Sequence, residues 1–250
     1  MVKKRPRLRT VEKNQAPYPL NDFSSGFAYA IGREIIYLLA YKGKGVLEGS
    51  EWEEIFAHCI GAEWKPSNVG LDDVVLGNTA WGAKTVKSNL KDLKSLKKVR
   101  LISGRNSPVY SYDEIIDRSV APDILGEQVL EIWNERVSSI REKYKHLRTV
   151  VLVKSHDLAK VIVFELETIR YEPDLFNFVW NKNGNLEGFD KKTNNKKFVW
   201  QPHGSQFTIF ETVPENSLFL ELKKPESLDK EKVLNAIGFD KTWISFTKLS

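Results

Sequence analysis

The sequence contains a single cysteine, Cys59, and this scarcity excludes two kinds of architecture. One thiol can neither form a disulfide within the chain nor build a cysteine-rich zinc site. The 4 histidines are also too widely spaced to form a metal-ligand motif. Stability must therefore come from an ordinary apolar core, and the near-absence of cysteine favours a reducing, cytoplasmic location.

Long apolar runs are absent as well. No run approaches the roughly 18 residues that a membrane-spanning helix needs, and the mean hydropathy is -0.38. The basic start of the sequence is not followed by an apolar stretch, so we expect neither a secretory signal nor a membrane partner. Hydrophobic residues still make up 41% of the chain, which is enough for a folded core. At 250 residues, one elaborated domain is favoured over two.

The positive charge is unevenly distributed. Lys and Arg number 38 against 33 Asp and Glu, a net charge of +5, and the excess gathers in residues 1–9 and 84–105. We interpret residues 1–20 as a flexible basic arm ahead of a single domain at 21–250. A solvated tail and a DNA-tracking arm account equally well for the first cluster. The second cluster is opposed only by Asp92.

Hydrophobic periodicity predicts a mixed α/β fold. The expected helices cover residues 25–41, 50–60, 122–145 and 228–237. The expected strands cover residues 71–76, 79–86, 99–102, 149–154, 161–166, 178–180, 198–200, 207–210 and 218–222. The nearly continuous apolar run at 149–154 is typical of a strand that is covered on both faces. We therefore expect a mixed central β-sheet flanked by helices, with a β-rich C-terminal elaboration, or annex, at about 176–222.

One acid-and-lysine hairpin is the strongest chemical motif of the chain. Asp73 stands at the start of a buried strand, a turn follows at Gly77-Asn78, and the next strand carries Lys84 pointing back towards the acid. This arrangement resembles the PD-(D/E)XK nuclease superfamily, and within it the type II restriction endonucleases. The resemblance covers about residues 48–105, as a catalytic half-core, and implies a restriction-endonuclease-like α/β core.

The resemblance also implies an activity. Asp73 would match the metal-binding aspartate and Lys84 the catalytic lysine of a Mg²⁺-dependent endonuclease that hydrolyses phosphodiester bonds in double-stranded DNA at specific sites. These residue types suit that chemistry, because cleavage builds charge on phosphate oxygens. A hard cation with oxygen ligands and a nearby ammonium both stabilise such charge.

The chain departs from the family pattern at Gly82. The family's second carboxylate usually lies two residues before the lysine, on the same face of the strand. A carboxylate from the preceding helix could replace it, and we take Glu53 first and Glu48 second. The segment from Ser50 to Glu53 also reads as a capping box, which would explain Glu53 without catalysis. Asp72 remains an alternative to Asp73 as the metal ligand.

Polar loops elsewhere are candidates for DNA contacts. Arg, Asn, Gln and Ser side chains on such loops can contact phosphates and base edges, although ordinary loop roles account for each residue alone. The acids Asp157, Glu165 and Glu167 are expected at the surface. The residues that we expect to bind DNA are Lys87, Arg105, Asn106, Ser107, Gln201, His203, Ser205 and Gln206.

The expected partners follow from the proposed reaction. An enzyme that cuts both strands of a palindromic site is commonly a symmetric homodimer, and its host needs a cognate DNA methyltransferase as a genetic partner. Gly82 keeps an alternative open, a non-catalytic DNA- or RNA-binding protein with a degenerate nuclease-like core. A further alternative is an unrelated α/β protein whose basic clusters are only solvated.

Overall fold

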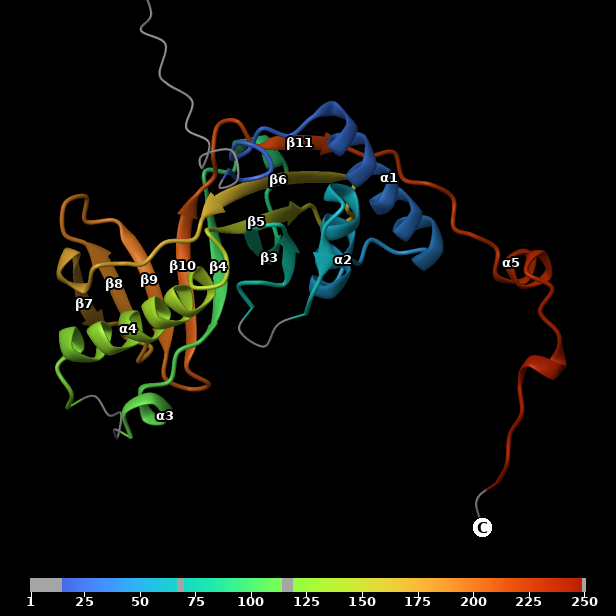
Figure 1. Ribbon diagram of the computed structural model, residues 1–250. Helices are drawn as coiled ribbons and strands as arrows, with labels where there is room; N and C mark the ends of the chain where they lie inside the picture. Colours follow the sequence, from blue (N-terminus) through green and yellow to red (C-terminus); the bar gives the residue numbers. More distant parts are fainter. Residues whose placement is uncertain (1–14, 67–69, 114–118, 249–250) are drawn as a thin grey trace, which may run out of the picture.

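The protein is a mixed α/β structure built on two β-sheets (Figure 1). The computed structural model describes residues 15–66, 70–113 and 119–248. The first sheet contains parallel and antiparallel neighbours, and the second sheet is antiparallel throughout. This architecture confirms the expected class, a mixed sheet flanked by helices.

The strands of the first sheet lie in the order β1-β2-β3-β5-β6-β11, and those of the second in the order β4-β10-β9-β8-β7. Only β3 and β5 are parallel neighbours among the described strands. The first sheet consists of β1 (Glu63–Trp64), β2 (Val74–Leu76), β3 (Thr79–Lys87), β5 (His146–Lys154), β6 (Lys160–Glu167) and β11 (Leu218–Glu221). The second consists of β4 (Lys98–Arg105), β7 (Phe176–Trp180), β8 (Leu186–Asp190), β9 (Lys196–Gln201) and β10 (Gln206–Thr212).

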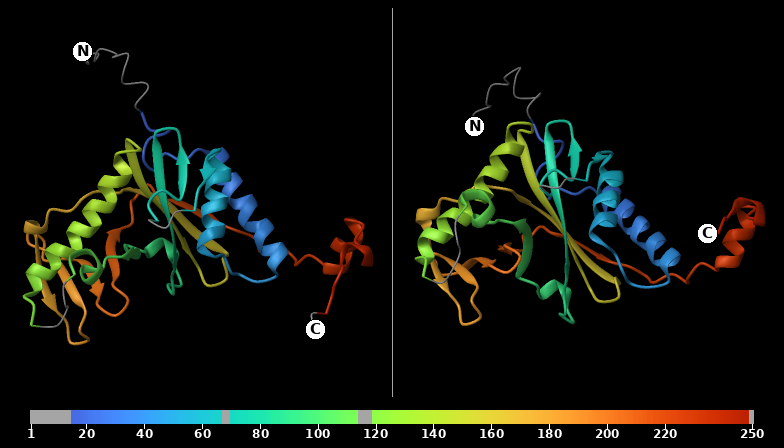
Figure 2. Two further views of the ribbon diagram at one scale, coloured as in Figure 1. Left: turned by 60° about the horizontal axis from the view of Figure 1, so that its bottom comes forward. Right: turned by 90° about the horizontal axis from the view of Figure 1, so that it is seen from below.

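The three longest helices lie on both sides of the first sheet (Figure 2). The α-helices are α1 (Ser25–Lys42), α2 (Gly49–Ile60), α3 (Pro108–Tyr112), α4 (Pro122–Arg141) and α5 (Lys230–Ala236). Short 3₁₀ turns occupy η2 (Leu93–Ser95), η3 (Pro173–Leu175) and η4 (Lys241–Trp243). No helix among the described residues combines the length and apolar character needed to cross a membrane.

Helices α1 and α2 cover one face of the first sheet. Ser24 caps α1 by accepting a hydrogen bond from the backbone N–H of Phe27, and Gly43 ends the helix at φ 65°. The apolar stripe of α2 packs into the sheet, where Trp52, Phe56 and Trp81 are fully buried. Burying an apolar side chain of this size contributes about 1.5–3 kcal/mol, so this face anchors β2 and β3.

Helix α4 packs between the two sheets. Its residues Leu130 and Trp133 share a core with Leu147 of the first sheet and with Trp200 and Phe207 of the second. A third core joins the remaining face of the first sheet to β4 and η2. Strand β5 is consequently buried on both sides, as its continuous apolar run predicts.

Two strands lie in a different sheet from the one that their sequence neighbours suggest. The strand at 99–102 follows the acid-and-lysine hairpin but extends as β4 in the second sheet, where Ile209 pairs with Leu101. The strand at 218–222 belongs to the expected annex, but as β11 it joins the first sheet, where Leu218 pairs with Val163. Sheet membership depends on long-range pairing, which local periodicity does not encode. The pattern also missed β1, β8 and α3.

Glu165 is fully buried, so the expectation that it lies at the surface is wrong. The alternation of β6 places it on the same face as Val163, towards α1. Its carboxylate accepts hydrogen bonds from Tyr18 Oη at 2.8 Å, Trp81 Nε1 at 2.6 Å and Arg148 Nη1 at 3.0 Å. Tyr18, within the expected arm of residues 1–20, is therefore docked on the body; residues 1–14 lie outside the described chain.

Candidate active site

The acid and the lysine of the predicted hairpin lie close together. Asp73 directly precedes β2, and Lys84 lies within β3, the antiparallel neighbour of β2. Asp73 is 4% exposed, and its carboxylate accepts a hydrogen bond from the backbone N–H of Ala83 at 3.2 Å. The Lys84 ammonium donates to the carbonyl oxygen of Gly70 at 3.2 Å. The hairpin thus holds an acid and a cation side by side on a rigid β scaffold.

The environment of Lys84 shifts its titration. Withdrawal of the ammonium from water lowers the pKa of Lys84, the carboxylates of Asp73 and Glu53 oppose that shift, and the guanidinium of Arg136 adds to it. Among the described residues, both candidate carboxylates therefore act electrostatically on the same lysine. A perturbed lysine beside two acids is typical of a functional site.

Glu53 is not used to cap its helix. The sequence pattern predicts a capping box from Ser50 to Glu53, but α2 begins at Gly49 and Glu51 performs this role. The Glu51 carboxylate accepts a hydrogen bond from the backbone N–H of Glu48 at 2.7 Å. Glu53 instead accepts a hydrogen bond from Trp64 Nε1 at 3.2 Å. The capping explanation for Glu53 is therefore wrong.

Glu48, the second candidate, interacts with a different lysine. Burial lowers the pKa of Lys154, and the carboxylates of Glu48 and Glu51 oppose that shift. Lys154 also donates a hydrogen bond to the carbonyl of Leu47. The structure therefore associates Glu53 with Lys84 and Glu48 with Lys154, which favours Glu53 as the replacement acid.

Backbone packing explains why position 82 carries no carboxylate. A Cβ atom on Gly82 would lie 2.9 Å from the carbonyl oxygen of Gly70 and 3.2 Å from the Cα of Leu71. Gly70 itself adopts φ 67°, a conformation suited to glycine. The segment at 70–71 thus occupies the space that a family-type acid would need.

The oxygen donors of this site fit a hard cation. In the described part of the chain, no group of three or more His, Cys, Asp or Glu side chains is placed to hold a metal ion. Mg²⁺, however, is commonly held by one or two carboxylates together with water and substrate phosphates. Asp73 and Glu53 supply two carboxylates. Asp72 is a third candidate donor, because its buried Oδ1 has no hydrogen-bond partner among the described residues.

Arg136 of α4 was missed by the sequence reasoning. Its guanidinium donates hydrogen bonds to Ser103 O at 2.7 Å and Asn106 Oδ1 at 3.1 Å. Gly104, at φ 104°, lets the Arg136 guanidinium approach the backbone of β4, because a Cβ atom on residue 104 would lie 2.6 Å from Arg136 Nη2. In the sequence, an arginine on the polar face of a helix gives no indication that it will bond to a distant strand. The fold brings Arg136 near Lys84.

The two loops expected to bind DNA lie beside each other. Arg105 at the end of β4 pairs with Gln206 at the start of β10. The backbone N–H of Asn106 also donates a hydrogen bond to Ser205 O at 2.9 Å. Residues far apart in the sequence, at 103–107 and 201–206, therefore form one surface.

Asn106 is not available to DNA in this structure. It is fully buried, its amide nitrogen donates to Val129 O at 2.9 Å, and its amide oxygen accepts from Arg136. The base contact expected for Asn106 is therefore corrected to a structural role. Ser107 is partly committed as well, because its hydroxyl caps α3 by accepting from Tyr110 N at 3.4 Å.

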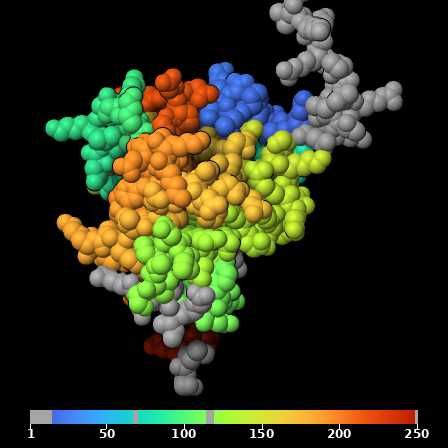
Figure 3. All heavy atoms as spheres, turned by 90° about the vertical axis from the view of Figure 1, so that its left-hand side faces the viewer, coloured from blue at the N-terminus to red at the C-terminus, as the bar shows by residue number. Residues whose placement is uncertain are grey.

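The remaining candidates are accessible. Lys87, Arg105 and His203 are exposed, and Gln201, Ser205 and Gln206 are partly exposed. In the space-filling view of Figure 3, strands and turns of the second sheet (orange) occupy much of the visible face. These six residues stay candidates for DNA contacts.

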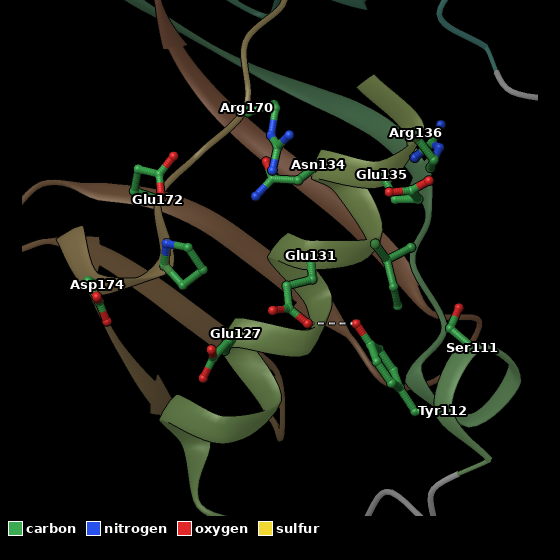
Figure 4. Close-up of a pocket in the computed structure, with 12 residues that line it drawn as sticks. Ser111, Tyr112, Glu127, Glu131, Asn134, Glu135, Arg136, Arg170, Glu172 and Asp174 are labelled. Atoms are coloured by element: carbon green, nitrogen blue, oxygen red, sulfur yellow. Dashed lines mark hydrogen bonds between the residues drawn. The ribbon is translucent and has the colours of Figure 1, made fainter. Parts of the chain in front are cut away.

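An acidic pocket of about 740 Å³ lies over α4 (Figure 4). Tyr112 Oη donates a hydrogen bond to Glu131 at 2.8 Å across it. Carboxylates outnumber guanidiniums in its lining, which disfavours the binding of phosphates in this pocket. The charged residues lining it are Glu127, Glu131, Glu135, Arg136, Arg170, Glu172 and Asp174.

Comparisons with family models, with curated proteins and with solved structures give no match to this chain. Fold and site geometry alone therefore support the functional argument.

Proposed function

We propose that this protein is a Mg²⁺-dependent, site-specific DNA endonuclease of type II restriction type. One observation carries the proposal: Lys84 lies on β3, the antiparallel neighbour of β2, and interacts electrostatically with Asp73, directly before β2, and with Glu53 of α2. The pattern matches what phosphodiester hydrolysis requires, namely carboxylate ligands and a cation around one phosphate.

Each residue has a distinct role in this proposal. Asp73 and Glu53 would hold Mg²⁺, which when bound would stabilise charge on the phosphate oxygens. Lys84 would place a positive charge beside the attacking water, and burial lowers the pKa of this ammonium. Arg136 adds a second positive charge near Lys84.

The basic surface and the paired loops supply the DNA contacts. Lys87 and Arg105 are exposed cations that suit phosphates, whereas Gln201 and Gln206 carry amides that suit base edges. We place the enzyme in the cytoplasm as a homodimer on double-stranded DNA, with a DNA methyltransferase encoded by a neighbouring gene.

Cleavage of phage DNA in Mg²⁺ tests the central pair. We expect Asp73→Asn and Lys84→Ala each to lower the cleavage rate at least about 100-fold, in the range for loss of a proton-transfer or electrostatic group. DNA binding in EDTA, followed by fluorescence anisotropy, should change less than about threefold (~0.6 kcal/mol). Lys191→Ala, an exposed lysine on the turn between β8 and β9, is the control. Wild-type cleavage by either site variant refutes the proposal.

Glu53 and its neighbour Glu54 form a second matched pair. Glu53→Gln should abolish cleavage, whereas Glu54→Gln, exposed on the same helix, should leave it intact. Full activity of Glu53→Gln would transfer the role to Glu48 or Asp72, each tested by its own amide variant.

A second function, non-catalytic DNA or RNA binding, is favoured by one specific observation. Gly82 is packed beneath Gly70 and cannot carry the family's second acid. Salt-dependent binding in EDTA, with no cutting of any DNA in Mg²⁺ by the wild-type protein, would establish this second function.

A further inference from the structure

The C-terminal arm, residues 223–248, stands away from the body of the protein. It follows β11 and contains α5 and η4. Figure 1 and both views of Figure 2 show these two elements at the end of an extended connection, separated from both sheets. None of its residues is classed as buried. The arm is therefore locally folded but does not pack into the core.

This arm carries many large apolar side chains. Their exposed fractions range from 40% for Val233 to 86% for Phe246. Monomeric proteins rarely expose apolar side chains at this density, and such patches commonly mark an interaction surface. The exposed apolar residues are Leu228, Val233, Ile237, Trp243, Ile244 and Phe246.

Helix α1 carries a second exposed apolar surface, here called the tyrosine stripe. Tyr29, Tyr37 and Tyr41 are 75%, 63% and 69% exposed. Their spacing of eight and four residues keeps them on one side of the helix, while Ile31 and Ile35 face the core. The stripe is an outward-facing row of amphipathic rings of the kind that is enriched at interfaces.

The base of the arm lies next to this stripe. The backbone N–H of Leu228 donates a hydrogen bond to Ala40 O at 2.9 Å. A Cβ atom on Gly43, which ends α1, would lie 3.0 Å from the hydroxyl oxygen of Ser227. Beyond this contact the arm runs away from α1 (Figure 1), and both the apolar side chains of the arm and the tyrosines of the stripe remain exposed.

We propose that two copies of this chain exchange their C-terminal arms, and that each arm packs on the tyrosine stripe of the other copy. Each copy carries both surfaces, so one two-fold axis pairs both arms with both stripes and the assembly closes. Because the stripe lies beside the root of the arm, the two contacts, each between one copy's arm and the other copy's stripe, would lie on either side of that axis.

The apolar area is sufficient for a stable dimer. Each contact between an arm and a stripe brings together the exposed aromatic side chains of both surfaces, two from the arm and three from the stripe. Large aromatic side chains bury ~150–250 Å² each, and these are already partly covered. The two contacts together would therefore remove on the order of 1,500 Å² from water. Stable interfaces bury about 1,200–2,000 Å². This inference does not rest on the nuclease proposal, and its test measures mass instead of cleavage.

Sedimentation of the full-length chain tests the exchange. We expect wild-type protein at twice the chain mass of 28.7 kDa. An arm variant, Trp243→Ser with Ile244→Ser, and a stripe variant, Tyr37→Ser with Tyr41→Ser, should each raise the dimer Kd at least about 100-fold. The control, Val109→Ser with Tyr110→Ser, changes two exposed apolar residues of α3 and should leave the dimer intact.

Mixing the two variants identifies the contact. In an equimolar mixture, the intact arm of the stripe variant meets the intact stripe of the arm variant, so one of the two contacts is restored. We expect the mixture to associate more tightly than either variant alone. Three results would overturn the proposal: a monomeric wild type at about 100 µM, dimers unaffected by either variant, or a mixture no tighter than its components.

Discussion

Gly82 shows how one missing side chain determines the construction of the candidate site. Its hydrogen faces the backbone at Gly70 and Leu71, so the acid expected at this position is replaced by a carbonyl that binds Lys84. In the proposed nuclease site the second acid would come from a different element, and Glu53 on α2 acts on the same lysine.

Gly82→Ala should destabilise the protein by about 1–3 kcal/mol, the usual cost of overpacking, because the new Cβ would lie 2.9 Å from a carbonyl oxygen. Urea denaturation measures this change. Gly49→Ala is the control, since nothing lies within 4 Å of a Cβ there. If Gly82→Ala is as stable as wild type, the backbone at 70–71 can shift at little cost in free energy. The close packing then does not explain the missing acid.

Lys84 should also leave a signature in the dependence of stability on pH. Its folded-state pKa is lowered by burial from the ordinary value of 10.5, so between the lowered and the ordinary pKa the unfolded chain binds more protons than the folded one. Stability must therefore rise with pH across this interval. Lys84→Met removes the titration, and the free energy of unfolding should rise less between pH 7 and pH 10 than in wild type.

Lys87→Met is the matched control, because Lys87 is exposed at the end of the same strand. Its stability should follow the wild-type pH dependence. Parallel curves for wild type and Lys84→Met would show that the lysine titrates normally, and would remove the main support for the site.

Among the elements, the junction of β4 with α4 joins the candidate site to the second sheet. Arg136 of α4 bonds to β4 and to the residue after it, and Trp200 Nε1 of β9 donates to Asn106 O at 2.7 Å. Asn106 is thus bonded to α4, β9 and the turn before β10. The position of α4 relative to both sheets depends on this residue.

Asn106→Ala should therefore lower the free energy of unfolding by about 2–4 kcal/mol, because each buried group left unsatisfied costs ~1–3 kcal/mol. Arg105→Ala, its exposed neighbour, should change stability by less than about 0.5 kcal/mol but weaken DNA binding. Thermal unfolding and anisotropy together separate the two effects. Reduced DNA affinity without lost stability in Asn106→Ala would restore the base-reading role.

The sequence predicts elements better than it predicts their neighbours. The stripe of α2 and the apolar run of β5 depend on local periodicity, and both are confirmed. The hairpin of Asp73 and Lys84 is also local, because a short turn fixes its geometry. Arg136, Glu165 and the sheet assignments of β4 and β11 depend on contacts between distant segments. No single-sequence pattern records those contacts.

At the scale of the whole molecule, exposed lysines lie before and within β4. Lys97 and Lys98 are exposed and belong to the basic cluster that begins at Lys84. An acidic pocket lies over α4 instead. If the protein binds DNA as proposed, we expect a division of roles, with the DNA on the basic cluster and not in the acidic pocket.

Salt dependence tests this division. Each phosphate contact contributes about 0.9 to the slope of log K against log salt. Lys97→Gln with Lys98→Gln should therefore reduce the slope by up to about 1.8. The control pair, Lys191→Gln with Lys192→Gln, changes exposed lysines on the turn between β8 and β9. Equal losses for both pairs would argue against a localised DNA path.

The crossed membership of β4 and β11 has a consequence for how the chain could be divided. Along the sequence, the strands alternate between the sheets: β1 to β3 in the first, β4 in the second, β5 and β6 in the first, β7 to β10 in the second, and β11 in the first. No single cut separates one complete sheet from the other. A fusion or truncation made between residues 98 and 218 would leave both fragments with unpaired strand edges.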